Sequence, residues 1–252
     1  MLVASTGKEV AKVAFEPFTW AHGVGIAMAA ALAIGIIGYR RRLRRSGMDN
    51  IARKALAAIL IGSEVSLYSW YTLTDNWGLY SLPFQLCSIM VWVSAALLLT
   101  RNKKLYEIAF FLGILGALQA LLTPDLDATY YEFRYFHFFL AHGAIISASI
   151  YMTAVTGWRP TAASVFRAIG WLHVLAVPAA ITNALAGTNF MFLARKPSSG
   201  SLLDLLSPWP WYLLQLEVVA LLMCFALLGI VLGIDAVIRR LNRYTPLHGG
   251  RS

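Results

Sequence analysis

Two residues of this sequence have side chains that could carry out covalent chemistry together. Cys87 lies about five residues into the third apolar run and His142 about seven residues into the fifth. If both runs are membrane-spanning helices entered from the same side of the membrane, both residues lie roughly 8–10 Å below that side. A thiol near a helix N-terminus, with a neutral imidazole at the same depth, is typical of a nucleophile and its base. Spacing alone favours a structural interpretation over this catalytic one. In it, the cysteine is buried as a small apolar side chain and the histidine only forms hydrogen bonds.

Other polar side chains lie at a similar depth in the apolar runs. They comprise two carboxylates, four amides and one further imidazole: Glu64, Gln85, Gln119, His137, Asn183, Gln215 and Glu217. Because polar groups inside a membrane are costly, we expect them to line one outward-facing cavity, where they would bind substrate or stabilise an oxyanion. The alternative is that they hydrogen-bond to one another as contacts between helices.

The same residues do not suggest a metal centre. His137 lies five residues before His142, which places it about 140° away around a helix. The sequence contains no HExxH motif, no cluster of Cys and His, and no glycine-rich loop of the phosphate-binding type. We therefore expect no metal and no cofactor.

The elements that position these residues are apolar and long. Of the 252 residues, 59% are apolar or aromatic and 13% are charged, whereas a soluble domain carries about 25% charged residues. Seven apolar runs can each cross a membrane as a helix: 18–38, 55–74, 82–100, 105–123, 135–155, 166–186 and 211–236. The sequence therefore predicts an all-α polytopic membrane protein with seven transmembrane helices, forming one domain over residues 1–252.

The positive charges predict how these helices are oriented. Sixteen Lys and Arg residues fall in loops on one side and five on the other, so the positive-inside rule places the N-terminus outside and the C-terminus inside. The net charge of +9 is thus a topology signal and not a nucleic-acid signal. We expect an extracellular segment 1–17, an extracellular loop 187–210 that can form a short interfacial helix, and a basic cytoplasmic tail 238–252.

Several ordered motifs resemble a known family. They are Leu82–Cys87, Gly116–Asp125, Phe138–Gly143, Gly187–Leu193, Lys196–Pro197, Ser201–Asp204 and Pro208–Tyr212. Together they resemble the YwaF-like bacterial integral membrane proteins and the related animal transmembrane protein 164. The animal branch is understood as an acyltransferase that moves a fatty acyl chain onto a lysophospholipid. Its proposed catalytic Cys and His map onto Cys87 and His142, while Gln85 replaces a His of many bacterial relatives.

The resemblance favours a membrane-embedded, thiol-dependent acyltransferase (transacylase). In this hypothesis Cys87 forms an acyl-enzyme with His142 as base, and the partners are membrane phospholipids and lysolipids, not nucleic acid. The alternative is a transporter or small-molecule receptor in which Glu64 and Glu217 are binding or proton-coupling groups; a scaffold for another membrane protein is a third interpretation. In each case we expect a multi-pass protein of the cell membrane, in the bacterial case the cytoplasmic membrane.

Overall fold

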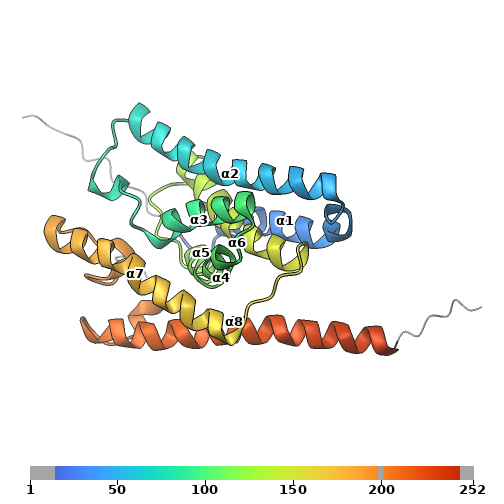
Figure 1. Ribbon diagram of the computed structural model, residues 1–252. Helices are drawn as coiled ribbons and strands as arrows, with labels where there is room; N and C mark the ends of the chain where they lie inside the picture. Colours follow the sequence, from blue (N-terminus) through green and yellow to red (C-terminus); the bar gives the residue numbers. More distant parts are fainter. Residues whose placement is uncertain (1–14, 198–200, 245–252) are drawn as a thin grey trace, which may run out of the picture.

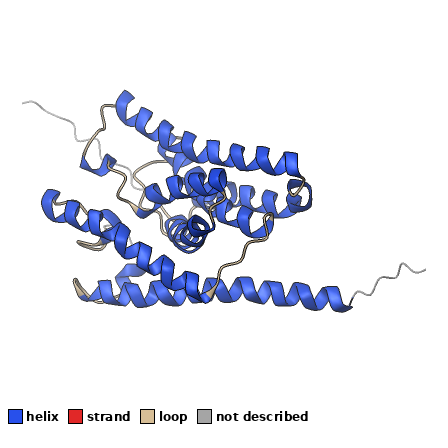
Figure 2. Ribbon diagram, in the orientation of Figure 1, coloured by secondary structure: helices blue, strands red, loops and turns tan. Residues whose placement is uncertain are grey.

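A computed structural model describes residues 15–197 and 201–244, and every regular element within these ranges is helical (Figure 2). The α-helices are α1 (Trp20–Leu43), α2 (Ser46–Leu73), α3 (Leu86–Thr100), α4 (Lys103–Ile108), α5 (Ile114–Leu122), α6 (Phe133–Ala154), α7 (Ala162–Ala186) and α8 (Trp211–Tyr244). Short 3-10 turns are η1 (Leu79–Ser81), η3 (Phe190–Phe192) and η4 (Leu202–Leu205), while η2 (Ala109–Gly113) is a π-helical turn.

Six helical segments of the described residues are long and apolar enough to cross a membrane. They are Trp20–Leu43, Leu79–Thr100, Lys103–Leu122, Phe133–Ala154, Ala162–Ala186 and Trp211–Leu241. The chain is thus a multi-pass, all-helical membrane protein. Helix α2 covers the second predicted run, but it carries Asp49, Arg53, Lys54 and Glu64 along its length and is not among the six. The seventh span and the orientation of the termini stay predictions.

Helix α6 is the centre of the bundle, with α1, α2, α3 and α5 packed around it (Figure 1). Its contact with α1 depends on small residues. A Cβ atom added at Gly143 would lie 2.7 Å from the backbone of Ala29, closer than two such atoms can approach. Glycine therefore lets the two helix backbones touch, as small residues do in membrane bundles.

The segment from α4 to α5 crosses the bundle as one span with a π-helical turn inside it. All five residues of that turn, Ala109–Gly113, are buried. A π-turn adds one residue to a helical turn, and such turns often occur at functional sites. Here it directly precedes α5, whose glycine-containing face borders the candidate site described below.

Helices α7 and α8 lie together on one side of the bundle, the side opposite α2 (Figure 1). Two ion pairs attach them. Arg167 of α7 bonds both carboxylate oxygens of Glu107 at 2.7 and 2.8 Å, and Arg159 bonds both oxygens of Asp235 on α8 at 2.5 and 2.9 Å. These bidentate pairs fix geometry as well as charge.

The segments outside the bundle agree only in part with the expected boundaries. Helix α8 continues to Tyr244, so the predicted basic tail 238–252 begins inside a helix, and residues 245–252 lie outside the described part. Residues 1–14 of the predicted extracellular segment also lie outside it. Within 187–210, the predicted interfacial helix corresponds to the single 3-10 turn Leu202–Leu205.

Candidate active site at the start of helix α3

Cys87 is the second residue of α3, closer to the helix start than the sequence predicted. The chain around Pro83 is not helical, and Gln85 has extended backbone angles (φ −71°, ψ 141°) as the N-cap. No side chain caps this helix start, so its first N–H groups have no intrahelical acceptor. The positive end of the helix dipole therefore lies at Cys87.

The Cys87 thiol lies against a glycine of α5. A Cβ atom added at Gly116 would be 3.7 Å from the Cys87 sulfur and 3.2 Å from the Leu86 side chain. One turn earlier on the same face, a Cβ at Gly113 would be 3.1 Å from the Ile145 side chain of α6. Gly116 of α5 thus contacts α3, and Gly113, the last residue of the π-helical turn η2, contacts α6.

These contacts define the relative heights of α3, α5 and α6. Helices α5 and α6 follow each other through the loop 123–132 and run in opposite directions. Gly116 therefore lies about 4.5 Å closer than Gly113 to the end of the bundle that holds the loop 123–132. His142 is closer to that end than Ile145 by the same amount. Because Gly113 lies beside Ile145, this counting predicts that His142 lies near the level of Gly116, although it is the tenth residue of α6 and Cys87 the second of α3.

His142 is held in one tautomer by its own helix. Its Nδ1 lies 2.7 Å from the carbonyl oxygen of Phe138, and the Phe138 ring packs on the imidazole with centroids 4.3 Å apart. A carbonyl can only accept, so Nδ1 carries the proton of the neutral ring and Nε2 keeps its lone pair. The ring is partly exposed, and its free nitrogen is the one that can act as a base.

Most of the chain around this geometry matches one family model. The match to the TMEM164 family covers residues 15–228, from the residues before α1 into α8. The chain belongs to the TMEM164 family. No curated protein and no solved structure shows significant similarity to it. The link to YwaF-like bacterial proteins stays a prediction.

In this TMEM164-family chain, the motif Gly187–Leu193 forms a loop that docks on the start of α3. The N–H of Met191 donates to Oε1 of Gln85 at 3.0 Å, and Asn183 bonds both the N–H and the carbonyl of Phe190, at 2.7 and 3.0 Å. Met191 and Phe192 both adopt left-handed backbone angles (φ 54°), which non-glycine residues rarely do. Asn183 is therefore a structural residue of this loop, whereas the Nε2 amide of Gln85 keeps its donors free.

The remaining amides and Glu217 differ in their distance from the thiol. Gln119 lies one turn beyond Gly116 on α5, and its Nε2 donates to Thr123 at 3.2 Å. Gln215 is exposed on α8 and bonds Ser207 through both polar atoms, at 2.7 and 3.0 Å. Glu217 is also exposed and pairs with His173 of α7 at 3.2 Å. The structure thus places Gln119 on the helix that contacts Cys87, bonded to Thr123, and gives Gln215 and Glu217 partners on or beside α7 and α8.

Glu64 and His137 lie in helices α2 and α6, which pack together. Glu64 is only 3% exposed and has no hydrogen-bond partner among the described residues. Nε2 of His137 is buried and likewise has no partner there. The His137 ring lies beside the backbone of Ser63, the neighbour of Glu64. These two groups form a second polar region, whose role the TMEM164 family match does not define.

Two functional groups of this site were missed by sequence reasoning. They are the Phe138 carbonyl, which sets the His142 tautomer, and the free N–H groups at the start of α3. The first has a sequence signal, because Phe138 lies four residues before His142, the spacing of helical neighbours. The second has a weaker one, since Pro83 marks a helix start only to within a few residues.

Proposed function

We propose that this protein is a membrane-embedded, thiol-dependent acyltransferase that moves a fatty acyl chain between phospholipid and lysophospholipid. The observation that carries the proposal is the close contact of Cys87 with Gly116 of α5, together with that of Gly113, one turn earlier, with Ile145 of α6. The second contact supports a position of His142 near the level of the thiol. Membership of the TMEM164 family supports the proposal, because the resemblance of its animal branch implies a Cys and a His at the positions of Cys87 and His142.

The chemistry assigned to the pair is acyl transfer in two halves. Nε2 of His142 takes the proton of the Cys87 thiol as the sulfur attacks the ester carbonyl of a phospholipid. The C–O bond breaks, the departing lysolipid oxygen takes that proton from the imidazolium, and the acyl chain remains on Cys87 as a thioester. A lysolipid hydroxyl then attacks the thioester, again losing its proton to His142, and the proton returns to the departing thiolate.

The oxyanion of each tetrahedral intermediate needs hydrogen-bond donors. The first N–H groups of α3 are placed for this role, since they have no intrahelical acceptor and belong to the turn that carries Cys87. The Nε2 amide of Gln85 is a further donor, because only its oxygen is occupied by Met191. Asn183 is less suited, because both of its polar atoms hold the loop.

The decisive experiment is mass spectrometry of the purified protein after incubation with a phospholipid of defined acyl chains. We expect an acyl adduct on Cys87, and loss of both adduct and transfer activity in Cys87→Ala. The matched control is Cys224→Ala, which removes the other free cysteine, a buried residue of α8. Each substitution leaves a small void costing about 1 kcal/mol, so both variants should fold. Full transfer activity in Cys87→Ala would refute the thiol mechanism.

We further propose that α2 also crosses the membrane, which makes seven spans in all. The N-terminus and the start of α3 would then lie on the outer side. Support comes from the 28 residues of α2, which give about 42 Å of helix, enough to cross a bilayer. The test places single cysteines at Leu205 and Lys103, both exposed. In intact cells a membrane-impermeant thiol reagent should label position 205 and not position 103; the reverse would overturn the orientation.

A further inference from the structure

A polar cavity lies at the basic end of the bundle, away from the α3 start. It has a volume of about 510 Å³ and is lined by Arg44, Asp49, Asn50, Arg53 and Arg101, with Val155 and Thr156 completing the wall. Three guanidinium groups and one carboxylate leave a surplus of two positive charges in it. The polar residues come from the corner between α1 and α2, from the first turns of α2, and from the corner after α3, while Val155 and Thr156 directly follow α6.

The single carboxylate of this cavity is already fully engaged. Asp49 accepts from Nε of Arg53 at 3.1 Å and from the Tyr151 hydroxyl at 2.9 Å. Arg53 is nine-tenths buried and also donates to the Leu98 carbonyl at 2.5 Å, so it is fixed in place. Arg101 has only a 3.6 Å ion pair with Asp49 and is half exposed. Arg101 is therefore the guanidinium with most of its donors available to a ligand.

The backbone of Arg101 is unusual for its residue type. It adopts the left-handed conformation (φ 54°, ψ 38°) directly after α3, a position where glycine is preferred. An arginine there is strained, and strain in a non-glycine residue often accompanies a functional constraint. Arg101 lines the cavity together with Arg44 and Arg53.

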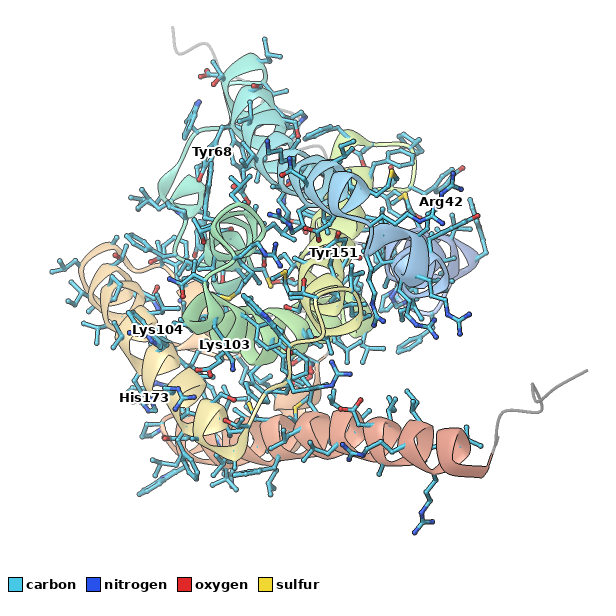
Figure 3. All side chains as sticks on the ribbon, turned by 45° about the vertical axis from the view of Figure 1, so that its right-hand side comes forward. Arg42, Tyr68, Lys103, Lys104, Tyr151 and His173 are labelled. Atoms are coloured by element: carbon cyan, nitrogen blue, oxygen red, sulfur yellow. The ribbon has the colours of Figure 1, made fainter. Side chains whose placement is uncertain are left out.

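An apolar groove of about 440 Å³ adjoins the polar cavity. It runs between α1 and α2, with Leu32 and Ile36 on one wall and Leu56 and Ile59 on the other. Tyr151 also lines the groove, and its hydroxyl donates a hydrogen bond to Asp49 of the polar cavity. This hydrogen bond links the lining of the groove to the lining of the cavity. Figure 3 shows Tyr151 between α6 and the start of α2, with Arg42, another groove residue, at the α1–α2 corner.

We propose that this composite site binds one anionic glycerophospholipid from the leaflet at the basic face. Its phosphate would occupy the cavity of Arg44, Arg53 and Arg101, and one acyl chain would lie in the groove between α1 and α2. Charge complementarity selects the headgroup, because guanidinium groups bind phosphate oxygens through charge-assisted hydrogen bonds. The site is separate from Cys87 and does not depend on acyl transfer.

The first test measures thermal unfolding of the delipidated full-length protein in detergent. Dioctanoyl phosphatidic acid should raise the unfolding midpoint, since a ligand that binds the folded state stabilises it, while dioctanoyl phosphatidylcholine should raise it far less. Arg101→Gln should weaken the response about tenfold yet still fold, because Asp49 keeps Arg53 and Tyr151. The matched control is Lys103→Gln, which removes the same charge nearby but lies on the side of α7, away from Tyr151 (Figure 3).

Three further variants test the apolar groove and the arginine cavity separately. Gly35→Leu fills the groove, whereas Gly38→Leu, on the same helix, does not, and neither new side chain meets another atom within 4 Å at its Cβ. Of these two variants, only Gly35→Leu should lose the lipid response. Arg101→Gly should raise the midpoint of the lipid-free protein, because it relieves the left-handed strain, and should lose the response.

Three results would overturn the proposal. They are no response of the wild-type protein to phosphatidic acid, equal responses of Arg101→Gln and Lys103→Gln, and a full response to inorganic phosphate alone at matched ionic strength. The last of these would mean that a free phosphate, not a lipid, is the ligand.

Discussion

Gly143 directly follows the candidate base His142, and it offers a sharp test of how α6 is positioned. In Gly143→Ala the new Cβ would lie 2.7 Å from both the Cα and the carbonyl oxygen of Ala29. Ordinary contacts of this kind are 3.4 Å or longer, and the atoms it meets belong to a helix backbone that cannot rotate away. Helices α1 and α6 must therefore separate.

The expected size of the effect follows from two opposing contributions. Alanine favours a helix over glycine by about 1 kcal/mol, and overpacking a tight contact costs about 1–3 kcal/mol. Gly170→Ala on α7 is the matched control, because its Cβ would meet nothing within 4 Å. The propensity gain is common to both variants, so Gly143→Ala should be less stable than Gly170→Ala by the overpacking cost alone.

The assay follows labelling of the buried Cys224 by a thiol reagent as the protein unfolds in increasing dodecyl sulfate, in a Cys87→Ser background. Equal unfolding free energies for the two alanine variants would refute the close contact between α1 and α6. In a protein that keeps Cys87, Gly143→Ala should also lower acyl transfer, because the separation of α1 and α6 moves His142 relative to Cys87.

Three other changes have defined outcomes. Asn183→Ala leaves the buried N–H and carbonyl of Phe190 without partners, so it should destabilise by about 1–3 kcal/mol and expose the loop to protease. Thr182→Ala should do neither, because Thr182 is only partly buried and its hydroxyl bonds Pro178 of its own helix. Asp235→Asn breaks the bidentate pair with Arg159 and should cost about 1 kcal/mol because the arginine is partly exposed; Arg240→Gln is its control in the same thermal assay. Hydrogen bonds from the backbone N–H and the hydroxyl of Thr129 lower the pKa of Glu132 in the folded protein. The small contribution of Glu132 to stability is therefore present above the unfolded pKa of about 4.3, and it is lost as the pH falls through the lower folded pKa. Glu132→Gln should remove that slope from a plot of unfolding midpoint against pH.

Much of the fold could be predicted from the sequence, because lipid imposes simple rules on helices. The predicted run 166–186 corresponds to Ala162–Ala186, and the run 105–123 to the span Lys103–Leu122. The ends of α2 and α8 were harder to predict. Both helices continue past their apolar stretch into a charged segment, α2 from Ser46 and α8 to Tyr244. Hydropathy marks where a helix enters the lipid, not where its hydrogen bonding begins or stops.

The candidate site was predictable in residue type but not in contact. Counting residues along the two helices does not by itself give a shared depth, since Cys87 is the second residue of α3 and His142 is the tenth of α6. Which groups face each other depends also on how far each helix is rotated about its axis, and on which helices are neighbours. In this bundle two glycines supply that information, since α6 approaches Gly113 of the π-helical turn and α3 approaches Gly116 of α5. Residue spacing does not indicate which helices meet at these glycines.

Gln215 and Glu217 show why depth alone is insufficient to predict a site. Both lie in α8 at a height that suggested a common cavity, yet α8 packs mainly on α7 at the edge of the bundle (Figure 1). There Gln215 bonds the loop at Ser207, and Glu217 pairs with His173. Polar residues on this peripheral helix thus form their hydrogen bonds with near neighbours. Depth in the membrane therefore indicates a shared site only for residues whose helix lies at the centre of the bundle. Helix α6 does, and it is the helix that carries His142.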